Sequence, residues 1–299
     1  MRPRTIKPAI NLSYNPDTSL STQNTPTQSL IIEPRRSVLL DFNLTDIWQH
    51  RELLVFLIWR DILIRYKQTF LGALWEIIKP LSIMAVLTLV MGYIARFPSD
   101  NIPYPLFYYS SVVIWSFFAQ SMNTATVSVL NASTLVSRVY FPRIIIPLGI
   151  VMSSLLDLLI ALLVLIPMMI WYCTMPTTHI WLLPFAILLA IVSALAFGLI
   201  FSALIVKYRD LQNVLPVLTQ LMVFITPVFY PASLVPSRWM FLYGLNPMAG
   251  AVQAFRWSLF PSSTAPWDLL LPGSIVAVLM LVGGIAFFQR MSRSFVDWL

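Results

Sequence analysis

The sequence has 299 residues, of which 58% are hydrophobic and only 10% are charged, and its formal net charge is +7. Soluble domains average roughly 45–50% apolar and 25% charged residues, so this composition excludes a soluble globular protein and indicates an integral membrane protein. The single cysteine, Cys173, excludes a disulfide within these residues and a cysteine-based metal cluster, and two distant histidines give no zinc pattern.

Residues 1–37 are rich in Ser, Thr, Asn and Pro and show no apolar periodicity. Such a segment cannot bury enough apolar surface to offset the entropy of ordering, so we predict a disordered cytoplasmic tail. A partner-docking role for the tail stays open. Residues 38–72 form the next predicted unit, with a helix that begins near Asn43 or Thr45, either of which can cap it, and runs to about Tyr66.

The apolar run within this helix, Leu53 to Trp59, is too short to cross a bilayer and is closed by Arg60 and Asp61. Tryptophans and basic residues accompany it, as in helices that lie in the membrane interface. We therefore predict an amphipathic interfacial helix on the cytoplasmic leaflet. A plain membrane anchor and an element that transmits force both fit these residues.

For residues 73–299 we predict an all-α membrane domain with six transmembrane helices. The apolar segments that define them are about 77–95, 106–130, 144–172, 180–206, 214–230 and 269–288. In this arrangement sixteen Lys and Arg residues lie on one side of the membrane and three on the other. The positive-inside rule then places both termini in the cytoplasm, so the net charge reflects topology and does not indicate a nucleic-acid partner.

One face of the second span carries aromatic side chains at a helical spacing of 4, 3, 4, 3 and 4 residues. Its members are Tyr104, Tyr108, Ser111, Trp115, Phe118 and Met122. Such a face can pack inside the protein or against lipid, but aromatic rings also stack on sugar rings without directional bonds. We keep Tyr104, Tyr108, Trp115 and Phe118 as a candidate substrate path, with packing as the alternative.

The third span contains one ionisable side chain, Asp157. An ionisable group at membrane depth costs several kcal/mol unless it is paired or protonated, so we expect it to face the interior of the bundle. A structural hydrogen bond between helices and a role in transport would each explain this residue.

The segment between the fifth and sixth spans, 231–268, is apolar but broken twice. Pro236 begins a helix that ends at Gly244, and Asn246 caps a second helix whose first residue is Pro247. Two half-length helices predict a re-entrant or interfacial hairpin on the outer side, either a gate or a passive cap. In the last span, the pair Gly283-Gly284 permits close approach of a neighbouring helix.

Four separated motifs, spread over roughly residues 44–290, resemble those of one family. They are R-D-x-x-x-R-Y-x-x-x-x-L-G-x-L-W-x-x-x-x-P at 60–80, L-V-x-x-V-Y-F-P-R at 135–143, the turn K-Y-R-D at 207–210, and the pair L-N-P-M at 245–248 with F-R-W at 255–257. The chain resembles the ABC-2 type transporter permeases that export polysaccharides such as O-antigen, capsule and teichoic acid.

The resemblance implies that the second motif is a coupling helix seated in a groove of an ATPase subunit. The implied contact residues are Leu135, Val136, Arg138, Tyr140, Phe141 and Arg143. The resemblance also implies a second contact with the ATPase at Arg209 and Asp210. The hairpin would be an external gate that includes Trp239, Asn246, Pro247, Phe255 and Arg256. The family also implies a homodimer of this chain with two copies of the ATPase. On topology alone, the coupling segment is a short loop with positive-inside arginines.

The implied function is a permease of the cytoplasmic (inner) membrane that exports a lipid-linked polysaccharide, with polyisoprenyl pyrophosphate as the expected lipid carrier. Arg60, Arg65 and Lys67 would then lie where the anionic lipid head group meets the cytoplasmic interface, although positive-inside topology explains the same residues. No G-x-x-x-x-G-K-[ST] loop occurs, so we expect no cofactor bound by this chain, with ATP and Mg²⁺ used by the partner ATPase.

Three other functions compete with this one. An ABC-2 exporter of a drug, haem or simple lipid is the alternative within the family. A membrane enzyme such as a polyprenyl-phosphate sugar transferase would need clustered acids, whereas Glu76, Asp157, Asp210 and Asp268 are scattered singly. We therefore predict no catalytic residue and no metal site, and a pure assembly scaffold would leave the hairpin unexplained.

Overall fold

The computed structural model describes residues 48–67, 72, 74–138, 141–261, 265–292 and 295. This part of the chain forms helices and no strand, as predicted. The predicted tail 1–37, the predicted helix start near Asn43 and the predicted site residue Tyr140 lie outside the described residues. Of Val136 and Arg138 only the backbone is described.

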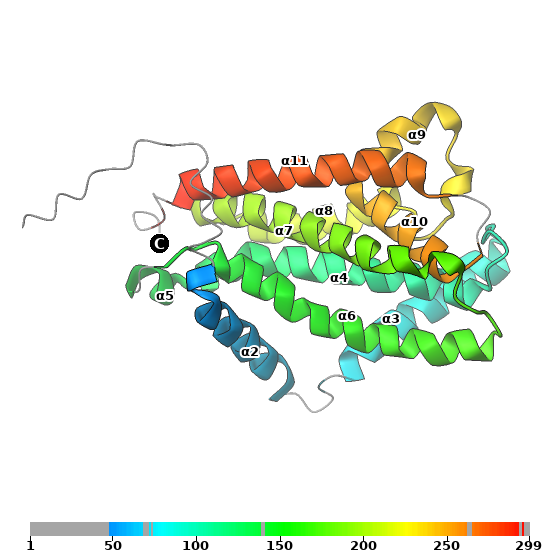
Figure 1. The fold of residues 1–299 in the computed structure, drawn as a ribbon, viewed down its shortest axis with the longest axis horizontal. Helices are drawn as coiled ribbons and strands as arrows, with labels where there is room; N and C mark the ends of the chain where they lie inside the picture. Colours follow the sequence, from blue (N-terminus) through cyan, green and yellow to red (C-terminus); the bar gives the residue numbers. More distant parts are fainter. Residues whose placement is uncertain are drawn as a thin grey trace, which may run out of the picture. The chain divides into compact units, whose positions relative to one another are not determined.

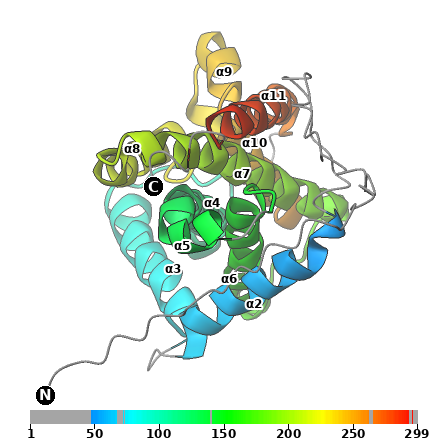
Figure 2. The same cartoon turned by 90° about the vertical axis from the view of Figure 1, so that its left-hand side faces the viewer.

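Helix α4 (Tyr104–Asn131) is the centre of the bundle. It begins after the extended Pro103, and Pro105 in its first turn suits a position where no backbone N–H is needed. Most of its side chains are buried because neighbours contact it on several sides. Those neighbours, arranged around α4 in Figure 2, are α3 (Leu74–Leu87), α6 (Ile145–Trp171), α7 (Leu183–Lys207) and α8 (Leu211–Ile225).

Two glycines allow the central helices to approach closely. A Cβ atom at Gly198 of α7 would lie 2.9 Å from the Cβ of Ala125 on α4, so only glycine fits this contact. On α11 (Trp267–Ser292), a Cβ at Gly284 would lie 3.1 Å from the carbonyl oxygen of Ala196. Gly283 has nothing within 4 Å, so Gly284 alone carries the close approach predicted for the pair.

Four helical segments of the described chain are long and apolar enough to cross a membrane, and they match four of the six predicted spans. They are α3 with the π-helix η1 (Thr88–Ile94), α6, the 3-10 turn η2 (Thr178–Leu182) with α7, and α11 (Figure 1). Helix α4 has 28 residues but is less apolar than these four, because serines, amides and threonines interrupt it.

Helix α8, at the predicted fifth span, has only 15 residues and ends at Ile225. Thr226 adopts an extended backbone because it precedes Pro227, whose ring disfavours a helical residue before it. The predicted span 214–230 is therefore wrong at its C-terminal end. The chain continues through the short η3 turn (Ala232–Leu234) to the next helices.

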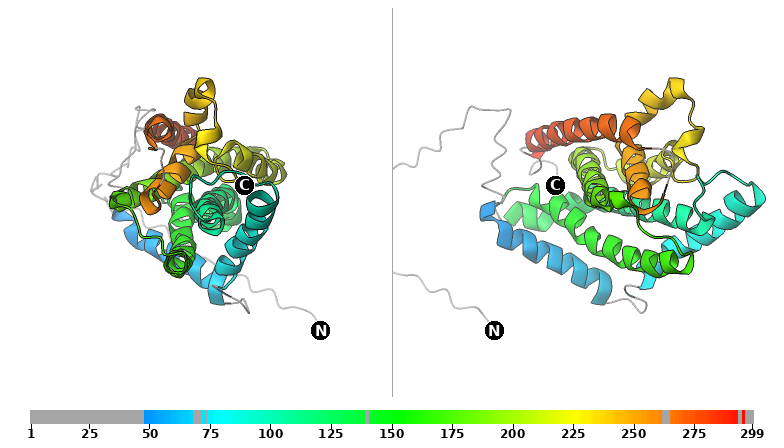
Figure 3. Two further views of the ribbon diagram at one scale, coloured as in Figure 1. Left: turned by 90° about the vertical axis from the view of Figure 1, so that its right-hand side faces the viewer. Right: turned by 45° about the vertical axis from the view of Figure 1, so that its right-hand side comes forward.

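The two helices predicted between the last spans are confirmed as α9 (Ser237–Gly244) and α10 (Pro247–Leu259). Asn246 caps α10 as predicted, because its Oδ1 accepts a hydrogen bond from the backbone N–H of Met248 at 3.1 Å. Helix α10 is buried against α4, α7 and α11, whereas α9 stands away from it and packs on α11 (Figure 3).

Helix α2 (Arg51–Lys67) packs along α6 (Figure 1). Its buried residue Leu57 joins Phe141 and Ile145 in a small apolar cluster, next to the short helix α5 (Ser133–Arg138). Other apolar side chains of α2, including Val55 and Trp59, are exposed, which is typical of a helix that also contacts lipid.

Candidate functional site

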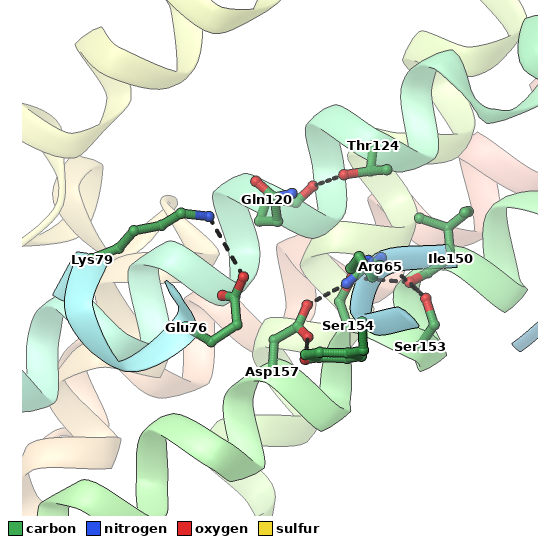
Figure 4. Close-up of polar contacts among 10 residues, drawn as sticks. Arg65, Glu76, Lys79, Gln120, Thr124, Ile150, Ser153, Ser154 and Asp157 are labelled. Atoms are coloured by element: carbon green, nitrogen blue, oxygen red, sulfur yellow. Dashed lines mark hydrogen bonds and ion pairs between the residues drawn. The ribbon is translucent and has the colours of Figure 1, made fainter. Parts of the chain in front are cut away.

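A buried carboxylate, that of Asp157 on α6, accepts hydrogen bonds from a second helix. Arg65 and Tyr66, at the C-terminal end of α2, each donate a hydrogen bond to it. Figure 4 shows Arg65 beside Asp157. Arg65 also donates to the hydroxyl of Ser153, one helical turn before Asp157, at 3.3 Å. The i, i+4 spacing of Ser153 and Asp157 places both on the α6 face that meets α2.

This junction stabilises a carboxylate that is only 9% exposed. A buried ion pair is costly to break, because removal of one partner leaves the other charge without compensation, at about 3–5 kcal/mol. Burial, together with the hydrogen bond to Asp157, raises the pKa of the Tyr66 phenol well above its usual value. Tyr66 therefore stays protonated at neutral pH and acts as a donor to the carboxylate.

A cavity of about 350 Å³ lies beside this junction, between α3, α4 and α6. Figure 4 shows Glu76, Gln120 and Asp157, from these three helices, around one region. The lining residues are Glu76, Lys79, Pro80, Ile83, Val113, Trp115, Ser116, Phe117, Ala119, Gln120, Asn123, Ser154, Asp157, Leu158 and Ala161. The lining therefore combines apolar and aromatic side chains with carboxylates, amides, hydroxyls and the ammonium group of Lys79.

The charges around the cavity balance. The ammonium of Lys79 lies 3.5 Å from a carboxylate oxygen of Glu76 one turn earlier on α3. The carboxylate of Asp157 pairs with Arg65. Two acids face two bases, so the cavity offers hydrogen-bonding groups without a large net charge.

The predicted substrate path, here called the aromatic stripe, consists of Tyr104, Tyr108, Trp115 and Phe118 on α4. It lies mainly inside the protein. Tyr108 and Phe118 have no exposed surface, and Tyr104 is half-buried. Trp115, 8% exposed, is the stripe residue that lines the cavity. The burial of Tyr108 and Phe118 favours the packing alternative for these two side chains, and Trp115 stays a candidate for contact with substrate.

The three basic residues assigned to a lipid head group have different surroundings. Arg60 pairs with the neighbouring Asp61 at 2.8 Å, and Lys67 is exposed at the end of α2. Arg65 is bound to Asp157 and Ser153. The sequence signal did not distinguish Arg65 from the other two, because its partners lie about ninety positions away in the chain.

The predicted coupling segment contacts helix α2 and the C-terminal end of α11. Phe141 is buried and Leu135 is half-buried, and both belong to the cluster around Leu57 of α2. Arg143 donates to the backbone carbonyl of Ser292 at the end of α11, and its guanidinium lies 5.7 Å from the ring centroid of Phe295. Residues Arg209 and Asp210, in the turn before α8, line a separate surface hollow with Lys207 and Tyr208.

The residues predicted for an external gate lie on α9 and α10. Trp239 is exposed on α9, while Pro247 and Phe255 are buried on α10. Arg256 is 2% exposed, donates to the carbonyl oxygen of Pro227 at 2.6 Å, and lies 4.4 Å over the ring of Phe107. This cation–π contact and the hydrogen bond fix α10 to the end of the α8 segment and to α4.

Sequence reasoning did not identify Tyr66, Ser153 and the cavity residues Glu76 and Lys79 as members of one site. Ser153 and Asp157 are four residues apart, so they share one face of their helix. This spacing is the pattern in the sequence that indicates a polar contact on that face. No pattern in the sequence indicated that α2 supplies its partners.

Comparison with known proteins gives a consistent result. The sequence model of the family described as ABC-2 type transporter matches residues 52–260. An O-antigen export system permease protein, RfbA, from Myxococcus xanthus is 28% identical over 255 residues, covering 84% of this chain and 97% of the relative. An RfbA from Klebsiella pneumoniae is 25% identical, covering 87% and 99%. The polysialic acid transport protein KpsM from Escherichia coli is 24% identical, covering 77% and 90%.

Proposed function

The chain belongs to the ABC-2 type transporter family, and we propose that it is the permease subunit of an exporter that carries a lipid-linked polysaccharide across the cytoplasmic membrane. The observation that carries this proposal is the similarity over nearly the whole length of permeases named for O-antigen export and polysialic acid transport. These cargoes are both polysaccharides, so the similarity favours a glycan over a drug, haem or simple lipid.

We further propose that α4 and α8 cross the membrane with the four longer apolar segments, which gives six spans and places both termini in the cytoplasm. Helix α4 is surrounded by other helices, so its hydroxyls and amides need not contact lipid. Helix α8 is short, but its 15 residues are apolar, and a bilayer can thin locally around a short span. The excess of Lys and Arg on one side supports this orientation.

In the proposed mechanism, ATP is hydrolysed on two copies of a separate ATPase subunit, which contact a homodimer of this chain. Movement of the ATPase would reach α5 and Phe141 first. The cluster that joins Phe141 to Leu57 would pass the movement to α2, and the contact of Arg65 with Asp157 would pass it to α6 beside the cavity.

Deletion of the gene in its own host tests the cargo. Surface glycan and the lipid-linked glycan retained inside are measured, and a plasmid copy of the gene serves as the control. Loss of glycan outside with accumulation inside is the expected result. If both pools are unchanged in a host without a second exporter, the glycan assignment fails and a drug, haem or simple-lipid cargo becomes the better explanation.

A charge reversal tests the ATPase contact. Arg209→Glu, in the turn before α8, should reduce co-purification of the ATPase with the permease, because it changes the charge of a predicted cytoplasmic contact. Arg238→Glu is the matched control, since Arg238 lies at the start of α9 on the side predicted to face outward. Equal co-purification of the two variants would contradict the assigned contact.

A further inference from the structure

We propose that the cavity between α3, α4 and α6 is a saccharide-binding site that holds an uncharged sugar unit of the exported chain. This inference rests on the proposed function and adds to it a defined site within one copy of the permease. It also assigns the binding to the sugar portion of the substrate and not to an anionic head group.

The size and walls of the cavity suit a sugar. Its volume of about 350 Å³ lies within the roughly 300–1,000 Å³ found for small-molecule sites. Trp115 and Phe117 supply aromatic surface, against which the apolar face of a sugar ring can pack. The polar groups of Gln120, Asn123 and Glu76 line the same space, so both kinds of sugar surface find a counterpart.

The lining also has unused hydrogen-bonding capacity. Asn123 accepts a hydrogen bond from the hydroxyl of Thr219 at 3.2 Å, which leaves its amide N–H groups available. Within the described chain, the side-chain amide of Gln120 and the indole N–H of Trp115 have no hydrogen-bond partner. Sugar hydroxyls both donate and accept, so they can pair with amides and carboxylates at once.

The charge pattern selects an uncharged ligand. An anionic group such as a pyrophosphate would lie against the carboxylates of Glu76 and Asp157, and the bases that balance these acids are already paired. A metal ion is not favoured, because the described residues contain no cluster of three or more metal-ligating side chains. Arg65 and Tyr66 act as positioning residues, since they hold Asp157 in the cavity wall without lining the cavity themselves.

Photocrosslinking in the living host tests the site directly. The photoreactive amino acid p-benzoylphenylalanine is placed at residue 120, which is exposed and lines the cavity. The matched control is residue 163 on α6, whose leucine is 65% exposed and does not line the cavity. After illumination, the purified permease is probed with an antibody or lectin against the host's surface glycan.

We expect a glycan-bearing adduct at residue 120 and none at residue 163, and its loss in a strain that cannot synthesise the glycan. If gene deletion abolishes surface glycan but residue 120 gives no glycan adduct, the saccharide site is wrong while the exporter function stands. Adducts of equal strength at both positions would also overturn the site. If deletion leaves surface glycan unchanged, the proposed function itself has failed.

A second variant measures the contribution of one amide. Gln120→Met keeps the length of the side chain but removes its hydrogen-bonding groups, and should lower the export rate by about 2- to 10-fold, the effect of one typical hydrogen bond. The amount of permease in the membrane and its co-purification with the ATPase should stay unchanged. Export at the wild-type rate would argue against binding through this amide.

Discussion

The contact between α2 and α6 depends on the charge of Asp157, and Asp157→Asn tests this dependence. The carboxylate accepts hydrogen bonds from both Arg65 and Tyr66. Hydrogen bonds to charged groups contribute about 1.5–3 kcal/mol each, and breaking a buried pair costs about 3–5 kcal/mol. The side chain of Arg65 is 24% exposed, so water compensates part of its charge, and the asparagine still accepts one hydrogen bond. We therefore expect a loss of about 2 kcal/mol from the α2–α6 contact.

Hydrogen exchange of the wild-type and variant permeases in lipid nanodiscs measures this loss. A weakening of 2 kcal/mol corresponds to roughly 30-fold faster exchange of amides at the C-terminal end of α2, if they exchange by detachment of the helix from α6. Arg60→Met is the matched control, because Arg60 pairs with Asp61 on its own helix. The double variant Arg65→Met with Asp157→Leu should recover most of the protection, since it leaves no uncompensated charge.

Two results would refute this reasoning. Unchanged exchange in Asp157→Asn would mean that apolar packing around Leu57 holds α2 without help from the ion pair. An equal effect of Arg60→Met would mean that any loss of charge from α2 detaches it, whatever the partner.

Three further predictions concern buried contacts of the bundle. Phe118→Ala should lower the thermal stability of the purified permease, since removing a fully buried phenylalanine costs about 3–5 kcal/mol. A variant as stable as the wild type would show that this side chain is not part of the core. Arg256→Met should loosen α10, because the variant loses the hydrogen bond to the carbonyl oxygen of Pro227 and the cation–π contact with Phe107. Residues 247–259 should then be cleaved faster by a protease, and unchanged cleavage would contradict the anchoring role of Arg256. Gly284→Ala should reduce the amount of folded permease, because Gly284 lies in close contact with α7. Gly283→Ala is the control and should have no effect, since the space around Gly283 is open. Equal effects of the two substitutions would rule out the close contact with α7 as the cause.

The aromatic stripe illustrates a limit of helical periodicity. The spacing places Tyr108, Trp115 and Phe118 on one side of α4, but it does not state what that side faces. Helix α4 has neighbours on several sides, so one of these residues borders the cavity while the other two are enclosed by packing. A count of aromatic residues cannot make this distinction, because burial depends on helices that lie far away in the sequence.

The sequence by itself determined the class of the protein, the positions of four apolar segments and the two helices of the hairpin with the Asn246 cap. These features depend on residues close together in the chain, such as an uninterrupted apolar run, a proline at a helix start or a capping side chain. The tertiary structure alone decided that Asp157 pairs with Arg65 and Tyr66, that Arg256 is held by Pro227 and Phe107, and that polar groups from three helices surround one cavity. Each of these contacts joins residues separated by about 30 to 150 positions, and only the packing of one helix against another brings them within bonding distance.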